Sequence, residues 1–207
     1  MSIHRVSAGD AICFGRYPQG SQGQIMPIEW RVLDVQGNRA LLLAQHILDV
    51  QPFAGEDGSL FWGDCRLRAW LEEEFMPRAF NAEELGQIWQ PEQSRQLDGD
   101  MILWLLFGMD DAVESVQDAV FVLSYADVLH YFPGKDSMFC PGASAQPTDW
   151  VRAQKQGADD LCWWLRSASA QSGIVYIVSP ADSVGASWNV QVTCQGVRPA
   201  LWLRMDN

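Results

Sequence analysis

The C-terminal segment of the chain has rigid ends and a middle without pattern, and this contrast restricts the fold more than any other feature. Residues 162–203 begin with "CWWLRS" and end with "GVRPALWL". The tryptophans and embedded arginines of these ends need packed surroundings with hydrogen-bond partners. Between the ends lie small polar residues and short strand-like runs such as "IVYIV" and "WNVQVT". The fold must therefore fix both ends of the segment and can leave its centre free.

The N-terminal part of the chain predicts a small sheet. The stretch "AICFGRYP" is typical of a strand, and "IEWRVLDV" alternates, with Ile28, Trp30 and Val32 on one face. Gly37 and Asn38 supply positive-φ positions between this run and "ALLLAQHIL". Two apolar runs around such a turn predict a β-hairpin.

A helix is predicted directly after this sheet. Asp64 is a suitable N-cap, and Leu67, Trp70, Leu71 and Phe75 recur at helical spacing in "CRLRAWLEEEF". The three glutamates of this stretch are expected on its solvated face rather than in acid–base chemistry.

Two more helices are indicated by capping boxes, in which a polar N-cap precedes an acidic residue by three positions. Asn81 with Glu84 predicts a helix through Ile88, and Ser124 with Asp127 predicts a helix over "YADVLHYF".

The remaining stretches are less regular. Within residues 91–118, "MILWLLFGM" fits a buried strand or a short helix, while "AVFVLS" predicts a strand and residues 133–160 a long irregular loop. Helices and strands followed by a loop-rich strand region indicate an α+β fold with mixed small sheets and two to three helices. We expect one domain over residues 1–207, with a base sheet and helices in about 1–90, an insertion and a helix in 91–160, and loop-rich strands in 161–207.

Charge and hydropathy exclude several classes of function. Subtracting 26 acidic from 14 basic residues gives a net charge of −12, which repels phosphate backbones and anionic lipids. We therefore expect no nucleic-acid partner, and a cationic or neutral ligand. No apolar run approaches the length of about 18 residues that spans a bilayer, and the start lacks the apolar region of a signal peptide. The expectation is a cytoplasmic protein without membrane insertion.

The five cysteines are widely spaced and include no C-x-x-C pair. This spacing argues against a zinc site and against a full disulfide framework, although a bridge between Cys162 and Cys194 stays open.

No familiar catalytic signature occurs in the sequence. His4, His46 and His130 lie outside G-x-S-x-G and H-E-x-x-H patterns, and neither a P-loop nor a G-x-G-x-x-G stretch occurs. We accordingly predict no catalytic residue, no metal and no cofactor.

Arg166 and Arg198 are each embedded among apolar residues. A guanidinium in such a place costs free energy unless carbonyls or a carboxylate bind it. Both arginines are therefore predicted to be buried struts that fix loop backbones.

Taken together, six stretches resemble a bacterial family of domains of unknown function that is common in gut Firmicutes and their phages. They cover about residues 7–203 and read "GDAICFGRYPQG", "IEWRVLDVQGNRALLLAQHILDVQPF", "CRLRAWLEEEFMPRAFNAEE", "DAVFVLS", "WWLRS" and "GVRPALWL".

The terminal pair "WWLRS" and "GVRPA" is also similar to C-type-lectin-like folds, namely formylglycine-generating-enzyme-like domains and the variable proteins of diversity-generating retroelements. This resemblance implies N- and C-terminal strands in one sheet, two helices alongside, and a loop-rich second sheet. It also implies that the late segment forms a ligand-binding surface on a rigid frame.

On this resemblance, the C-terminal segment divides into frame and displayed positions. The expected frame residues are Trp163, Trp164, Arg166, Gly196, Arg198 and Trp202. The expected ligand-binding positions are Ala168, Ser169, Gln171, Ser172, Tyr176, Ser179, Trp188, Asn189, Gln191, Thr193 and Gln195. Aromatic residues among Ser and Asn are typical of a binding surface.

The leading expectation is a non-enzymatic module that binds a protein or cell-surface ligand, phage-associated or surface-delivered if its retroelement likeness holds. Calcium-dependent sugar binding is not expected, because Trp188-Asn189 is followed by Val190 instead of the aspartate of sugar-binding lectins. Two alternatives stay open: an oxidoreductase of the formylglycine-generating type that uses Cys162 and Cys194, and a structural or assembly subunit.

Overall fold

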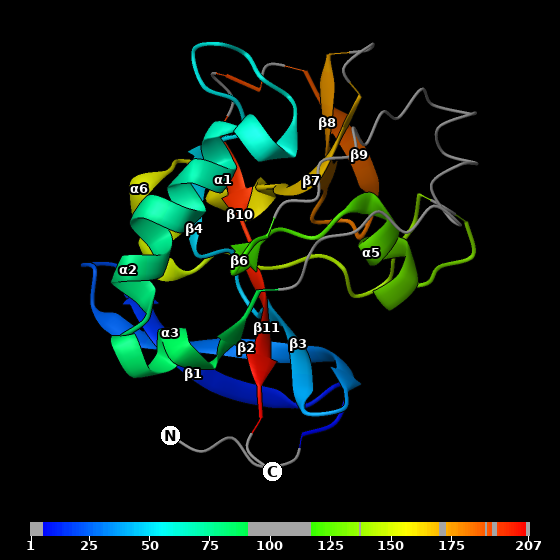
Figure 1. Cartoon of the computed structure of the whole chain (residues 1–207). Helices are drawn as coiled ribbons and strands as arrows, with labels where there is room; N and C mark the ends of the chain where they lie inside the picture. Colours follow the sequence, from blue (N-terminus) through cyan, green and yellow to red (C-terminus); the bar gives the residue numbers. More distant parts are fainter. Residues whose placement is uncertain are drawn as a thin grey trace.

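The computed structural model describes residues 6–90, 117–136, 138–169, 173–188, 190–191 and 194–205. Its described residues form two sheets with helices packed beside them, which confirms the α+β class (Figure 1). The first sheet has the order β1 (Ala11–Pro18), β2 (Ile25–Gln36), β3 (Arg39–Ala44), β11 (Ala200–Arg204) and β5 (Ile88–Trp89). The short strand β6 (Val120–Phe121) also pairs with β11. All of these pairings are antiparallel.

The second sheet has the order β4 (Asp49–Pro52), β10 (Cys194–Val197), β7 (Trp163–Ser169), β8 (Ile174–Val178) and β9 (Val184–Ser187). Strands β10 and β7 run parallel, and the other pairs run antiparallel. Sequence-distant strands thus pair in both sheets, and β11 joins the N-terminal hairpin as expected.

The hairpin around Gly37 forms as predicted. Ile28, Trp30 and Val32 are fully buried on one face of β2, and β2 pairs with β3. Only Gly37 of the turn has a positive φ, at 62°, so the expectation that Asn38 shares this conformation is wrong.

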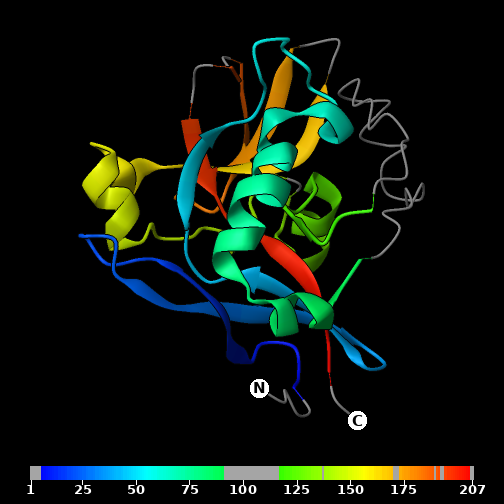
Figure 2. The same ribbon diagram turned by 60° about the vertical axis from the view of Figure 1, so that its left-hand side comes forward.

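Helices cover one side of the first sheet. A 3₁₀ turn η1 (Trp62–Asp64) leads into α1 (Arg66–Trp70), a π-helical turn η2 (Leu71–Phe75) and α2 (Met76–Ala79). The capping box of Asn81 and Glu84 opens α3 (Ala82–Gln87), which ends one residue before the predicted Ile88 because that residue enters β5. In Figure 2 these helices lie in front of β11.

The predicted N-cap of the first helix is wrong. Asp64 ends the 3₁₀ turn, and Cys65 caps α1 through its sulfur, which accepts a hydrogen bond from the Arg68 backbone N–H at 3.4 Å. The predicted apolar face is correct, because Leu67, Trp70, Leu71 and Phe75 are all buried.

The region after residue 117 contains more helix than its composition indicated. The capping box of Ser124 and Asp127 opens α5 (Tyr125–Tyr131), as predicted. Residues 133–160 are not one irregular loop, because Thr148 caps α6 (Asp149–Gln154) and a 3₁₀ turn η3 (Ala158–Asp160) follows.

Strand predictions in this half are corrected in two places. The "AVFVLS" strand is limited to Val120–Phe121. In "WNVQVT", the described residues Trp188, Val190 and Gln191 lie in a bend and a turn after β9 instead of in the predicted strand. The "MILWLLFGM" prediction, residues 101–109, falls outside the described residues.

Two hydrophobic cores lie on opposite sides of β3 and β7. Leu42 and Trp164 belong to the core beside α1–α3, while Leu43 and Trp163 belong to the core beside α5. Neighbouring residues of a strand point to opposite faces, so both strands are buried on both sides. This explains the uninterrupted apolar runs "ALLLA" and "WWL".

Candidate functional site

Two short crossings join the two sheets, residues 45–48 between β3 and β4 and Arg198-Pro199 between β10 and β11. The two crossings, which we call the joint, lie side by side. The Ala44 N–H donates to the Pro199 carbonyl at 2.9 Å, and the Leu48 N–H donates to the Val197 carbonyl at 3.0 Å. The string "GVRPALWL" is therefore two strands of different sheets, β10 and β11, separated by the joint.

Arg198 holds this joint together. Its side chain is 2% exposed, its Nε donates to the Ala44 carbonyl at 2.7 Å, and its Nη1 donates to the Ala143 carbonyl at 2.8 Å. The guanidinium also lies over the Trp163 ring, 5.2 Å from its centroid. Burial and, to a smaller extent, the nearby charge of Arg31 together lower the pKa of Arg198 to about 9. With this pKa the guanidinium is still charged at neutral pH. The prediction of a strut bound by carbonyls is confirmed.

The paired tryptophans support the same joint from the second sheet. Trp163 donates its indole N–H to the Ala143 carbonyl at 3.1 Å, and Trp164 donates to the Gln51 carbonyl at 2.8 Å. Gly196 leaves no space for a side chain, because a Cβ there would lie 2.6 Å from Ile47. Trp202 is only half-buried and packs edge-on against Trp89, with ring centroids 6.1 Å apart.

Arg166 is bound less completely than Arg198. Its Nη2 donates to the Asp127 carboxylate at 3.0 Å, and its guanidinium lies 5.2 Å from the Phe121 ring centroid. Its Nη1 atom is buried and has no hydrogen-bond partner among the described residues. The carboxylate expected for Arg166 is thus present, and within the same residues it binds only the Nη2 side of the guanidinium.

The predicted ligand-binding positions are in different environments. Ala168 is only 6% exposed and contributes to the first core, so its prediction as a displayed residue is wrong. Its side chain faces the first core together with Trp164 and Val175, beyond an irregularity in the β7–β8 register after Trp164. Tyr176 packs on Tyr125 with centroids 5.4 Å apart, and the Ser179 and Ser183 hydroxyls are hydrogen-bonded at 2.7 Å in the turn between β8 and β9.

The other predicted positions are exposed, half-buried or outside the described part of the chain. Trp188 is 65% exposed, Gln191 is exposed and Gln195 is half-buried in β10. Ser169 ends β7, and its side chain lies outside the described part. Four positions fall outside the described residues: Gln171, Ser172, Asn189 and Thr193.

Trp188 and Gln191 adjoin a loop that sequence reasoning missed, residues 53–61 between β4 and η1. The Phe53 and Ala54 N–H groups both donate to the Val190 carbonyl at 3.1 Å, and the Gln191 amide donates to the Glu56 carbonyl at 3.3 Å. Figures 1 and 2 both place this loop beside the turn after β9, at the end of the molecule opposite the termini.

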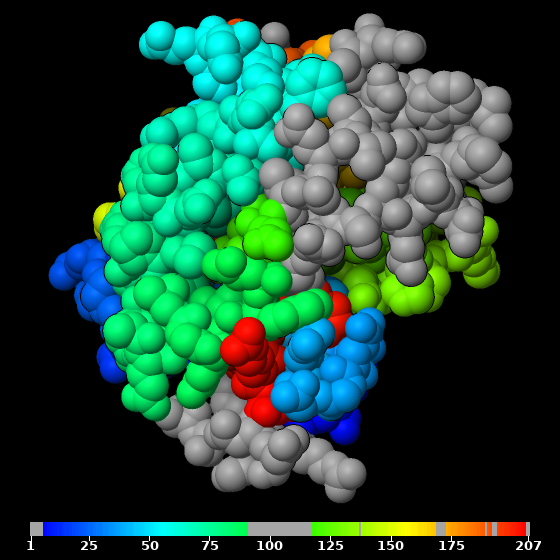
Figure 3. Space-filling view, in the orientation of Figure 1, coloured from blue at the N-terminus to red at the C-terminus, as the bar shows by residue number. Residues whose placement is uncertain are grey.

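We call this surface the distal rim and define it by five exposed residues: Glu56, Asp57, Phe61, Trp188 and Gln191. Phe61 is 47% exposed, and the loop that carries it stands at the top of the space-filling view (Figure 3). The sequence signal for this loop is the turn-rich string "GEDGS" between two aromatic residues. Such a string predicts a turn, but it does not predict that the turn contacts the residues after β9.

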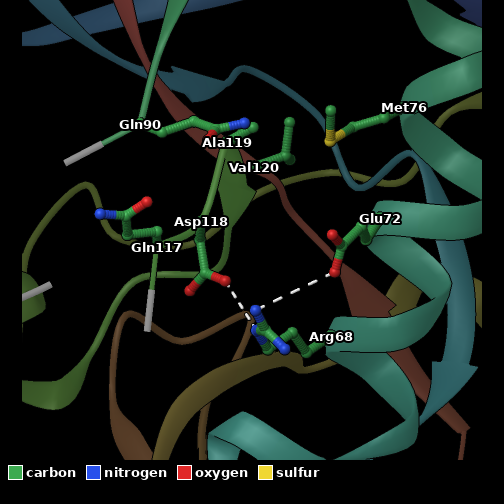
Figure 4. Close-up of a pocket in the computed structure, with 8 residues that line it drawn as sticks. All are labelled: Arg68, Glu72, Met76, Gln90, Gln117, Asp118, Ala119 and Val120. Atoms are coloured by element: carbon green, nitrogen blue, oxygen red, sulfur yellow. Dashed lines mark hydrogen bonds and ion pairs between the residues drawn. The ribbon is translucent and has the colours of Figure 1, made fainter. Parts of the chain in front are cut away.

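A second candidate is a small polar pocket between the first helices and β6 (Figure 4). Asp118, 4% exposed, accepts hydrogen bonds from Trp62 Nε1 and from Arg68 Nε, both at 2.7 Å. Arg68 also donates to the Gly63 carbonyl at 3.1 Å, and Glu72 lies 3.9 Å from its Nη2. The buried Asp118 carboxylate and the partly buried Arg68 are bound to each other, so this contact fastens the helical layer to β6.

The described cysteines offer no disulfide. All five are free, and Gly196 is the parallel-ladder partner of Trp163, which places Gln195 opposite Cys162. Since neighbouring strand residues face opposite sides, Cys194 and Cys162 point away from each other. Burial raises the pKa of the Cys162 thiol, which disfavours the thiolate that cysteine chemistry requires.

The described residues include neither a cluster of metal ligands nor a helix of transmembrane character. No group of three or more His, Cys, Asp or Glu side chains in this part of the chain could hold a metal ion. None of the helices over the same residues has the length and apolar character needed to cross a bilayer.

Comparison with known proteins gives a family and no function. A family model described as "Domain of unknown function (DUF6273)" matches residues 37–205, which is more than half of the chain. No curated protein and no solved structure matches.

Proposed function

We propose that this chain, which belongs to the DUF6273 family of domains of unknown function, is a non-enzymatic binding module whose recognition face is the distal rim. The observation that carries the proposal is the exposure of Trp188, at 65% the most exposed of the large hydrophobic residues that the structure describes.

The surroundings of Trp188 favour binding over chance exposure. It directly follows β9, whose residues pair with β8 from Val184↔Val178 to Ser187↔Val175. The turn after it is fixed by hydrogen bonds from Phe53 and Ala54. A large aromatic side chain on a fixed backbone buries much area on binding and loses little conformational entropy, which is why Trp is enriched among residues that dominate binding energy.

The resemblance to C-type-lectin-like variable proteins supports a finer proposal, in which the rim belongs to a diversified segment. Its support is the sequence likeness of "WWLRS" and "GVRPA", together with a late segment whose ends are buried while Trp188 is exposed. A genomic test decides it. We expect a near copy of the DNA for residues 163–200 that differs only at adenine positions and lies beside a reverse transcriptase gene; a neighbourhood without such a copy contradicts diversification and leaves the binding module.

The binding proposal is tested by screening the purified protein on glycan, peptide and host-surface-protein arrays. We expect ligands that the wild type retains and that Trp188→Ser loses. Ile25→Ser is the matched control, because Ile25 is 54% exposed and belongs to the first sheet. Ligands that bind equally to all three proteins would place recognition elsewhere, and the absence of any Trp188-dependent ligand would contradict the proposal.

The same preparations address the two alternatives. For the formylglycine-generating type, Cys162→Ser and Cys194→Ser are assayed for oxidation of a peptide cysteine, and activity that depends on either residue would contradict a non-enzymatic module. For an assembly subunit, light scattering after size-exclusion chromatography reports the oligomeric state.

A further inference from the structure

We infer that the distal rim binds a cationic peptide segment of a partner protein, with a lysine or arginine side chain placed over the Trp188 indole. The inference rests on the proposed function and adds the chemical class of the ligand. It is carried by the combination of exposed aromatic rings with carboxylates and by the absence of basic residues from the strands and loops that form the rim.

The aromatic part of the rim provides the contact surface. Trp188 and Phe61 are 65% and 47% exposed, so each offers open ring surface. A guanidinium or ammonium over an indole face gains about 0.5 to 2 kcal/mol, depending on how far it is desolvated.

The negative charge of the rim favours a positively charged ligand. Glu56 and Asp57 are exposed in the loop, and Asp64 is exposed just after it. No lysine or arginine occurs in residues 40–65 or 167–197, the stretches that supply β4, the loop, β8, β9 and β10, and the Lys155 ammonium that reaches β10 is bound to the Cys194 carbonyl.

The nearest basic residue in sequence does not offset these carboxylates. Arg66 follows the loop, but its guanidinium is bound to Glu74 at 2.9 Å. The whole chain adds a net charge of −12, which raises the association rate of cations and repels phosphorylated or sulfated ligands.

The rim is also held in one arrangement before binding. The Ser59 N–H donates to the Asp57 carboxylate at 3.2 Å, and Gly58 adopts a φ of 72°. A Cβ at Gly58 would lie 2.8 Å from the Gln191 amide nitrogen, so the loop and the turn are in close contact. A surface fixed in this way loses little conformational entropy when it binds a ligand.

The test is selection from a random-peptide display library on the immobilised full chain, with Trp188→Ser for counter-selection. We expect the retained peptides to be enriched in arginine and lysine. A selected peptide should bind about tenfold more weakly to Trp188→Ser, and replacement of its basic residues by glutamine should cost a similar factor. Its affinity should also fall as salt is raised.

A charge-matched pair of variants isolates the rim. Glu56→Gln/Asp57→Asn should weaken the basic peptide several-fold, while Glu29→Gln/Glu73→Gln, which removes the same charge from exposed positions on β2 and η2, should not. Equal losses in both pairs would mean that only net charge matters, and this would overturn the inference.

Failure of the inference is distinguishable from failure of the proposed function. Trp188-dependent peptides without basic enrichment, or Trp188-dependent glycans alone, would overturn the cationic ligand and keep the binding module. A library and arrays that yield no Trp188-dependent ligand would overturn both.

Discussion

The joint and the distal rim use the same kinds of residue in opposite ways. At the joint, Trp163 and Trp164 are at most 1% exposed and donate their indole N–H groups to backbone carbonyls. At the rim, Trp188 of the same C-terminal segment is 65% exposed beside a loop with the exposed acidic residues Glu56 and Asp57. The difference teaches that residue type does not separate buried scaffold from exposed surface in this segment; the strand position does.

The strand position acts through pairing. Strand β7 is central in the second sheet, between β10 and β8, so both of its faces are covered. Strand β9 is the last strand in the order of that sheet, and Trp188 lies where its pairing with β8 ends. A tryptophan at a central position must be buried with its N–H satisfied, whereas one beyond an edge strand can remain exposed.

The largest expected effect is at the joint. Arg198→Ala should lower the free energy of unfolding by about 3 to 5 kcal/mol, because it removes a large buried side chain and two charge-assisted hydrogen bonds. Urea denaturation followed by circular dichroism measures the loss. Arg204→Ala, at an exposed position of β11, is the control and should change stability by less than about 0.5 kcal/mol.

Arg198→Lys sharpens this result. A lysine ammonium is a point charge and does not reproduce a fork directed at the Ala44 and Ala143 carbonyls. We expect it to be clearly destabilised as well. If Arg198→Ala were as stable as the wild type, the joint would not differ energetically from the rim, and the comparison would fail.

The next largest effect is expected at the Asp118 contact between helices and sheet. Asp118→Ala should cost about 2 to 3 kcal/mol, because Arg68 and the Trp62 N–H lose a buried acceptor. Thermal and urea unfolding measure it. Glu72→Ala is the matched control on the same arginine: Glu72 is 66% exposed and 3.9 Å away, so the change should stay within about 0.5 kcal/mol. Similar losses in both variants would mean that burial does not determine the strength of these contacts.

Local signals were sufficient to predict much of the scaffold. The turn at Gly37, the capping boxes at Asn81 and Ser124, and the apolar face of Leu67 and Phe75 all depend on residues a few positions apart. Helix α6 could also have been found, since Thr148 followed by Asp149 is an N-cap signal. The Gly and Pro residues of the surrounding stretch favour loops and obscure this local signal.

The rim could not be predicted from local signals. Its two parts, the loop after β4 and the turn after β9, are more than a hundred positions apart, as in the hydrogen bond from Gln191 to Glu56. The division of "GVRPALWL" into strands of two sheets likewise depends on pairing with β4, β7 and β3. Ala168 was expected at the surface because the resemblance places it among the displayed positions, but its pairing with Val175 turns it inward.

A smaller effect is expected at Asp182, in the turn that precedes β9. Its carboxylate accepts a hydrogen bond from the Ser144 N–H at 2.7 Å, and this bond with those from neighbouring backbone groups lowers the pKa of Asp182 despite partial burial. A lowered folded pKa stabilises the protein above the unfolded value of about 4 and loses this effect as pH falls through the folded pKa. Asp182→Asn should cost about 1 kcal/mol at neutral pH.

The asparagine variant should also lose less stability than the wild type on acidification below about pH 4. Asparagine tolerates the positive φ of 56° at this position, so the backbone is not the cause of the change. Urea unfolding over a pH series measures the slope, with Asp160→Asn at an exposed position as control. An unchanged slope in Asp182→Asn would show that this carboxylate does not anchor the turn before β9.

The smallest expected effect on stability is at the rim, and it tests the comparison most directly. Trp188→Ser removes a large ring, but most of that ring is already in water, so we expect a change in unfolding free energy of less than about 0.5 kcal/mol. Trp164→Ser, the buried counterpart in the same segment, should cost about 3 to 5 kcal/mol. Urea unfolding of both variants measures the difference. A loss above about 1.5 kcal/mol for Trp188→Ser would show that this side chain supports the fold. It would then belong to the scaffold, because a residue that the fold needs cannot vary freely at a binding surface.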